Sequence, residues 1–129
     1  LKLWGNLTFN PVSALTHATL AQICRHPHTR ALALGMMGEA QQVAEKLGVR
    51  FRISLERRLA GAEAVGEHKT SMLQDVEQGR PLELDALLGS VIELAKLTDT
   101  PVPRCEAIYA CCALLAERLA TQHARLSLG

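Results

Sequence analysis

The sequence predicts an all-α fold, organised as a multi-helix bundle, and three observations point to it. Aromatic residues make up only 3% of the chain, while Ala and Leu are abundant; this composition favours helices over strands. Apolar residues recur at helical spacing in several segments, and Gly or Pro stands where many of these segments end. With 129 residues, 48% of them hydrophobic, the chain is long enough for one globular, soluble domain with a buried core.

The first helix is expected to run from about Leu1 to Phe9. Asn10 and Pro11 then indicate a break, because the residue before proline avoids the helical conformation. Asn also caps helices well, and Pro is favoured at a first helical position. A second helix is therefore expected to begin at Asn10, and its apolar positions continue up to a loop at His26–His28.

Five more helices are expected after this loop. They span about Arg30–Leu47 (N-cap Thr29, ending at Gly48), Ser54–Val65 (ending at Gly66), Ser71–Gln78 (ending at Gly79), Leu82–Leu97 and Pro103–His123. The segment Leu82–Leu97 is the most hydrophobic, and its apolar residues surround most of the helix, so we place it at the centre of the bundle. Gly89 within it would let another helix approach closely. No strand is predicted, since Val49–Ile53 is short and lies between two helices.

Charge and cysteine usage exclude several classes of function. Fourteen basic residues balance thirteen acidic ones, giving a formal charge of +1, and no basic block indicates a nucleic-acid partner. The apolar runs are too short for a membrane span. The four cysteines (Cys24, Cys105, Cys111, Cys112) form no C-x-x-C pair, and no two histidines are spaced i, i+4 beside a third ligand. We therefore expect reduced core cysteines, no metal site and a cytoplasmic protein.

A polar stripe near the N-terminus is the first indication of a binding site. Lys2, Asn6 and Asn10 recur at every fourth residue of an apolar segment. In a helix each step of four advances only about 40° around the axis, so the three groups share one face. One ammonium and two carboxamides on that face suit a pocket for an oxygen-rich small molecule. Because the chain begins at Leu1 without an initiator Met, we expect it to be part of a larger protein.

Three motifs, in order, resemble one known family. They are K-x-x-x-N-x-x-x-N-P-x-S-A-L-T from Lys2, H-K-T-S-M-L-Q-D from His68 and G-R-P-L-E-L-D-A-L-L-G from Gly79, and Glu39-x-x-x-Val43-Ala44-x-x-x-Gly48 is similar to the family's middle helix. Together they resemble the C-terminal domain of ketopantoate reductases (2-dehydropantoate 2-reductases) over nearly the whole chain, to about Tyr109. The resemblance implies one helical domain over 1–129, similar in architecture to the C-terminal domain of 6-phosphogluconate dehydrogenases.

The family reduces ketopantoate to pantoate with NADPH, on the route to pantothenate. The resemblance implies that NADP(H) is bound mainly by an N-terminal Rossmann domain, which is absent from this chain. No G-x-G-x-x-G follows a strand here, so the chain alone is expected to be inactive. The partners implied are a 2-keto acid substrate, the chain's own Rossmann domain and a second copy of the protein.

Five residues take site roles by this resemblance. Lys2 stands at the general-acid position, where its ammonium would give a proton to the carbonyl oxygen. Asn6 and Asn10 would donate to substrate oxygens, and Ser71 would contact the substrate at a helix start, where a carboxylate is favoured. Glu83, in the first turn of the helix Leu82–Leu97, would orient Lys2 or the ribose hydroxyls of the cofactor.

Structural alternatives stay open for several of these residues. Lys2 at a chain end is equally a solvated lysine, Asn10 before Pro is an ordinary helix cap, and Ser71 or Thr70 caps the helix that follows. Asp75, Arg80 and Asp85 are expected to be structural, through ion pairs or caps. Two other functions also remain: a reductase of this family that acts on another 2-keto acid, and a helical dimerisation or interaction module without chemistry of its own.

Overall fold

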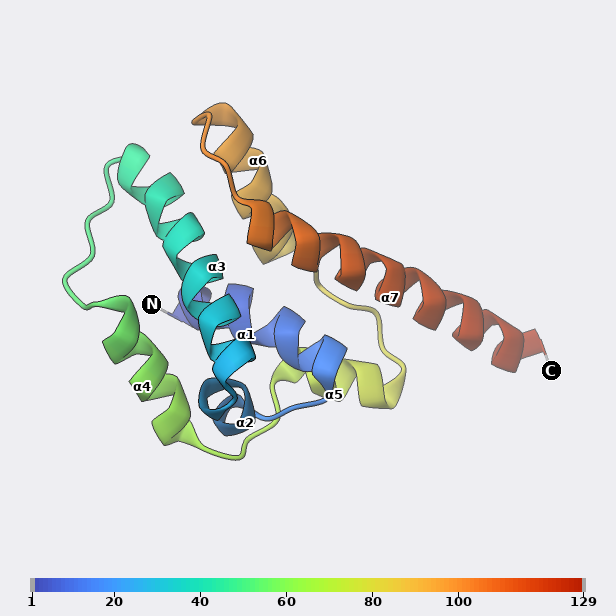
Figure 1. The fold of residues 1–129 in the computed structure, drawn as a ribbon. Coiled ribbons are helices and arrows are strands. Elements are labelled where there is room, and N and C mark those ends of the chain that lie inside the picture. The colour runs from blue at the N-terminus through green and yellow to red at the C-terminus, as the bar shows by residue number, and fades with distance from the viewer. Residues whose placement is uncertain (1, 129) are drawn as a thin grey trace.

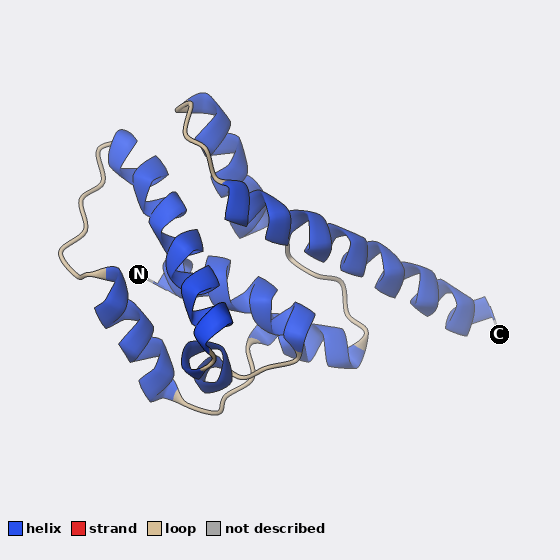
Figure 2. Cartoon of the chain, in the orientation of Figure 1, coloured by secondary structure: helices blue, strands red, loops and turns tan. Residues whose placement is uncertain are grey.

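The computed structural model describes residues 2–128, and the side chains of residues 7–122. Within that part it contains α-helices, one π-helical turn and no strand (Figure 2). The elements are α1 (Lys2–Thr16), α2 (Leu20–Arg25), α3 (Pro27–Lys46), α4 (Leu55–Val65), α5 (Ser71–Gln78), η1 (Asp85–Gly89), α6 (Ser90–Leu97) and α7 (Pro103–Leu128). The prediction of an all-α fold is confirmed.

Helix α1 lies inside the bundle and is contacted by α2, α3, α5, α7 and η1 (Figure 1). Helices α2 and α4 pack together at one end, and the long helix α7 extends away from the other helices toward its C-terminus. All the helices contribute buried side chains to the core, and α1 and α3 contribute the most. The fully buried side chains include Val12, Ile23, Met36, Met37, Leu59, Leu73, Leu88, Val102 and Cys105.

The expected break at Asn10 and Pro11 is wrong, because α1 continues through both residues. A proline inside a helix removes one hydrogen bond and costs about 3 kcal/mol in isolation. Here Pro11 is fully buried, and its carbonyl oxygen lies 3.6 Å from the thiol Sγ of Cys112 on α7. Burial of α1 against its neighbours offsets the local cost, so tertiary packing overrides the sequence signal.

The start of α3 also differs from the expectation. The chain turns at His17, which has φ +61°, and Thr19 begins α2 with a capping box that it shares with Gln22. Helix α3 then begins at Pro27, so the loop expected at His26–His28 is largely helical. Thr29 is not the N-cap, because its hydroxyl donates to the carbonyl oxygen of Ile23 at 2.7 Å.

The helix ends marked by glycine are confirmed. Gly48 and Gly79 have φ values of +91° and +70°, which glycine adopts without the strain that a side chain would add. The amide of Gly48 donates to the Glu45 carbonyl at 3.0 Å, which closes the end of α3. Ser54 caps α4, and α5 spans Ser71–Gln78 as predicted.

The single central helix expected over Leu82–Leu97 is wrong in two respects. Residues 81–84 are not helical, and the remainder is a π-helical turn followed by the short helix α6. It lies at the side of the bundle, since Leu97 is 82% exposed while Leu88 is buried. Its apolar residues face all directions, but only one side is covered by other helices. A Cβ at Gly89 would lie 2.9 Å from Oδ1 of Asp85 in the same turn and 3.4 Å from the Tyr109 ring on α7, so the crowding there comes mainly from Asp85.

Helix α7 is attached to α3 through one buried carboxylate. Glu39, 7% exposed, accepts the backbone N–H of Arg104 at 3.1 Å and that of Cys105 at 3.0 Å. The Arg104 guanidinium adds a contact of 3.3 Å. Because Pro103 has no N–H, Glu39 satisfies the next two donors of the helix and acts as its cap from another helix.

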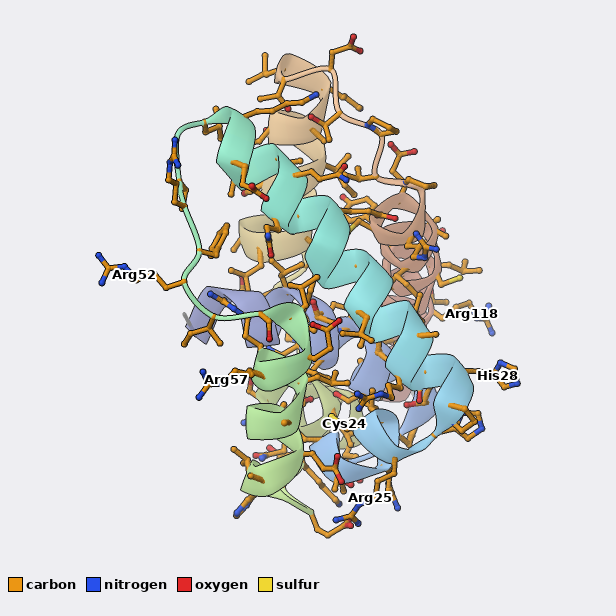
Figure 3. The ribbon with its side chains drawn as sticks, turned by 60° about the vertical axis from the view of Figure 1, so that its left-hand side comes forward. Cys24, Arg25, His28, Arg52, Arg57 and Arg118 are labelled. Carbon is orange, nitrogen blue, oxygen red and sulfur yellow. The ribbon has the colours of Figure 1, made fainter. Side chains whose placement is uncertain are left out.

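Three of the four thiols belong to the core, as expected, whereas Cys111 is exposed on α7. The Cys24 thiol lies between α2 and α4, 3.6 Å from the Leu59 carbonyl oxygen (Figure 3). Burial raises the pKa of Cys24, and it raises the pKa values of Cys105 and Cys112 to about 12. These three thiols therefore stay protonated at neutral pH. Among the described residues, no helix is long and apolar enough to cross a bilayer.

Candidate functional site

Two of the predicted substrate-binding residues meet in the structure. Asn10, in the middle of α1, donates from Nδ2 to Oγ of Ser71 at 3.4 Å, although the two residues are 61 positions apart in the sequence. Asn10 is 8% exposed, whereas Ser71 at the start of α5 is exposed. At this length the hydrogen bond is weak. Both groups therefore keep hydrogen-bonding capacity for a ligand where α5 packs on α1.

A second polar pair lies beside the first, deeper in the protein. The hydroxyl of Ser13, one turn after Asn10 on α1, is hydrogen-bonded to the hydroxyl of Thr70. Thr70 is the N-cap of α5, and its Oγ1 accepts the backbone N–H of Leu73 at 3.1 Å. Of the two expected capping residues, Thr70 therefore caps the helix, which leaves the Ser71 side chain to face Asn10.

Lys2 and Asn6 lie in α1 by their backbone, but their side chains lie outside the described residues. Because α1 is one continuous helix, both positions precede Asn10 at the four-residue steps that the sequence predicts. Their roles therefore stay predictions.

Glu83 is not in the first turn of a helix, as expected, but in the non-helical segment before η1. The chain becomes helical only at Asp85, two residues later. Glu83 is exposed. The structure thus brings Asn10 and Ser71 together, whereas Glu83 lies in the non-helical segment between α5 and η1.

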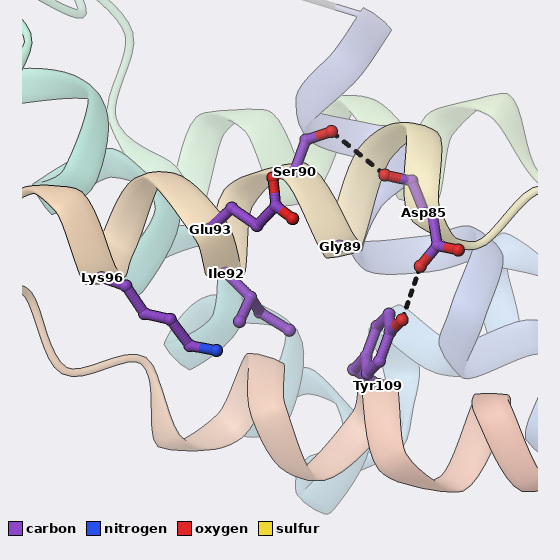
Figure 4. A pocket seen from close by; sticks show the side chains of 7 residues that line it. All are labelled: Asp85, Gly89, Ser90, Ile92, Glu93, Lys96 and Tyr109. Carbon is purple, nitrogen blue, oxygen red and sulfur yellow. Dashed lines mark hydrogen bonds between the residues drawn. The ribbon is translucent and has the colours of Figure 1, made fainter.

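The expected structural residues do make structural contacts. Arg80 Nε donates to Oδ1 of Asp75 at 2.9 Å. Asp85 Oδ1 accepts the Tyr109 hydroxyl at 2.5 Å, and this hydrogen bond raises the pKa of Tyr109. A cavity of about 490 Å³ beside that pair lies between α6 and α7 (Figure 4). Neither this cavity nor a second one between α5 and α7 is lined by a predicted site residue.

No group of three or more His, Cys, Asp or Glu side chains in the described part of the chain could hold a metal ion. His68, which precedes the Ser71 motif, is exposed, as are His26 and His28. In Figure 3 the side chain of His28 points away from the bundle, as do those of Arg52, Arg57 and Arg118, which come from three different segments.

The sequence did not lead us to predict that Ser13 belongs to the candidate site. Its position one turn after Asn10, in N-P-x-S, is the signal that could have found it, because a helix places residues i and i+3 side by side. The contact to Thr70, 57 residues later, has no local signature.

Comparisons with known proteins identify the family of this chain. The model of the family described as ketopantoate reductase PanE/ApbA C terminal matches residues 1–116. A 2-dehydropantoate 2-reductase of Mesorhizobium japonicum is 57% identical over 122 residues, which are 95% of this chain and 36% of that relative. The chain therefore spans about a third of the length of this curated relative.

Two solved structures share the fold. The 2-dehydropantoate 2-reductase of Methylococcus capsulatus matches with a TM-score of 0.85 and 29% identity, over 92% of this chain and 41% of that one. A dimeric ketopantoate reductase of Staphylococcus aureus matches with a TM-score of 0.76 and 27% identity, over 92% of this chain and 42% of that one. The matched family model and the shared helical fold together show that this chain belongs to the ketopantoate reductase family, to its C-terminal domain.

Proposed function

We propose that this chain forms the substrate side of an NADPH-dependent 2-keto acid reductase that converts ketopantoate to pantoate. The observation that carries the proposal is the contact between Asn10 and Ser71, at 3.4 Å. Two residues that the resemblance assigns to substrate binding come from distant segments and meet where α5 packs on α1. The similarity to proteins named 2-dehydropantoate 2-reductase supports the same substrate.

The chemistry of these side chains fits the reduction of a ketone. Hydride addition to the carbonyl carbon turns its oxygen into an alkoxide, and the ammonium of Lys2 would give this oxygen a proton. The carboxamides of Asn6 and Asn10 would donate hydrogen bonds to substrate oxygens without adding charge. Ser71 would donate to the substrate carboxylate, which the first backbone N–H groups of α5 and the helix dipole also attract.

The residues present do not form a dinucleotide site. The described part of the chain contains no strand, and the sequence contains no G-x-G-x-x-G, the turn that holds a pyrophosphate in Rossmann domains. In our proposal the nucleotide is bound mainly by a Rossmann domain of the longer protein, and 1–129 is the helical domain that closes on it. Glu83 would face that domain and orient Lys2 or the ribose hydroxyls, and its exposed position is compatible with this role.

The test uses the full-length protein that contains this chain, with NADPH oxidation as the readout. Lys2→Ala should lower kcat for ketopantoate by about 100-fold or more, the range expected for loss of a general acid. Lys96→Ala, which removes an exposed lysine of α6, is the matched control and should leave kcat unchanged. An active Lys2→Ala variant would favour a helical dimerisation or interaction module over a catalytic domain.

A panel of 2-keto acids tests the substrate separately. We expect the highest kcat/KM for ketopantoate, and a clear preference for another 2-keto acid would instead support a family member with a different substrate. We further propose a cytoplasmic protein that pairs with a second copy of itself, as the dimeric Staphylococcus aureus relative does. Light scattering of the full-length protein measures this oligomeric state directly.

A further inference from the structure

Helices α1 and α5, which carry Asn10 and Ser71, pack side by side (Figure 1). The hydroxyl groups of Ser13 and Thr70 connect them. Ser13 is fully buried and Thr70 is 8% exposed. Ser13 lies one helical turn after Asn10 on α1, and Thr70 directly precedes Ser71 at the start of α5. The buried pair therefore lies next to the contact between Asn10 and Ser71.

The protons of this cluster can be assigned from its hydrogen bonds. Ser13 has one hydroxyl proton, and it donates to the backbone carbonyl oxygen of Asn10 at 3.1 Å, since a carbonyl only accepts. Ser13 Oγ must then accept the proton of Thr70 in the contact between the two hydroxyls. Thr70 Oγ1 in turn accepts the backbone N–H of Leu73 at 3.1 Å.

The result is a directed chain of three hydrogen bonds that begins at the first turn of α5 and ends at the backbone of Asn10. Every donor in it has one acceptor, so no other arrangement of the two hydroxyl protons satisfies all three contacts. A buried and fully satisfied chain of this kind holds its members in a single geometry. By contrast, the contact between Asn10 and Ser71 is long, at 3.4 Å, and cannot set the distance between the helices by itself.

We propose that Ser13 and Thr70 are positioning residues, which fix the spacing of Asn10 and Ser71 and thereby the binding of the 2-keto acid. This inference rests on the proposed function. The two hydroxyls touch no substrate. They act through the residues next to them, because a shift of the start of α5 against α1 would move both substrate-binding groups apart.

The experiment compares Ser13→Ala, Thr70→Val and Thr70→Ser in the full-length protein. Ser13→Ala and Thr70→Val each break the chain, and we expect KM for the 2-keto acid to rise about tenfold, with kcat changed less than about threefold, since uniform binding is lost rather than chemistry. KM for NADPH should stay unchanged. Thr70→Ser keeps the hydroxyl and should restore KM to within about twofold of the original.

A matched control separates positioning from stability. Thr16→Val removes another hydroxyl of α1, which donates at 2.8 Å to the carbonyl of Val12 in its own helix and not to α5. It should leave KM unchanged. Because Ser13 and Thr70 act through one chain of bonds, the double variant should raise KM no more than either single variant does.

The outcomes distinguish this inference from the proposed function. If the original protein turns over no 2-keto acid, the proposed function fails and the positioning role fails with it. If the protein is active but KM is unchanged in both Ser13→Ala and Thr70→Val, positioning alone is overturned. Equal changes in KM for the substrate and for NADPH would also overturn it, since they would indicate general loosening of the fold.

Discussion

The buried carboxylate of Glu39 should contribute more to stability than its ion pair with Arg104 suggests. Its two oxygens accept the backbone N–H groups of Arg104 and Cys105, while the Arg104 guanidinium is 55% exposed. In Glu39→Gln a single carbonyl oxygen replaces two acceptors, so one N–H at the start of α7 faces an amide NH₂ and loses its partner. Leaving a buried donor unpaired costs about 1–3 kcal/mol.

The lost charge adds to this cost. A negative group near a helix N-terminus is worth about 0.3–1 kcal/mol, so we expect Glu39→Gln to lower the free energy of unfolding by about 1–4 kcal/mol. Arg104→Ala is the comparison, because it keeps both backbone hydrogen bonds to Glu39 and removes only a half-exposed pair. Such pairs contribute about 0–1 kcal/mol.

Urea unfolding followed by circular dichroism of both variants measures the two costs. The expected order is a larger loss for Glu39→Gln than for Arg104→Ala. A loss in Arg104→Ala that equals or exceeds that in Glu39→Gln would refute the capping argument and assign the stabilisation to the ion pair. An unchanged midpoint in Glu39→Gln would refute it as well.

Four other predictions concern stability and thiol chemistry. Thr8→Val should raise the free energy of unfolding by about 1 kcal/mol in urea titrations, since the buried Thr8 Oγ1 has no partner among the described residues; a lower stability contradicts this. Gly79→Ala should cost about 1 kcal/mol by the same assay, because φ is +70° there. The pKa values of Cys105 and Cys112 are raised from 9.0 to about 12. The contribution of these two buried thiols to the free energy of unfolding is therefore fully present below pH 9 and is lost as the pH rises toward 12. The reason is that the thiols of the unfolded chain release their protons at a lower pH than those of the folded protein. A thiol reagent at neutral pH should modify Cys111 quickly and the three buried thiols only after unfolding, and rapid reaction of a second thiol would contradict the burial.

Local signals in the sequence were sufficient to predict most of the helices. Ser54, Gly48 and Gly79 were predicted at helix ends because caps and positive φ depend on neighbouring residues alone. The continuity of α1 through Pro11 was not predictable in this way. It depends on burial by helices that come later in the chain, and local preference at Asn10 and Pro11 points the opposite way.

Only part of the candidate site could be predicted, because the remaining contacts also join segments that are distant in the sequence. Asn10 and Ser71 could be named from motifs, and the structure places their side chains in contact, while their binding roles stay a proposal. The hydrogen bond between Ser13 and Thr70 joins segments whose own patterns carry no sign of each other. Glu83 falls in the helix that the apolar pattern of Leu82–Leu97 predicts, but the chain becomes helical only at Asp85.

The attachment of α7 has a consequence for the order in which the protein folds during synthesis. The carboxylate of Glu39 finds its two backbone donors 65 and 66 residues later, and the Pro11 carbonyl meets the Cys112 thiol 101 residues later. Until residues 103–112 have left the ribosome, α1 and α3 lack the helix that covers them and a charged group stays unpaired beside the core. The helix that carries Asn10, although among the first made, is therefore enclosed only after α7 has been synthesised.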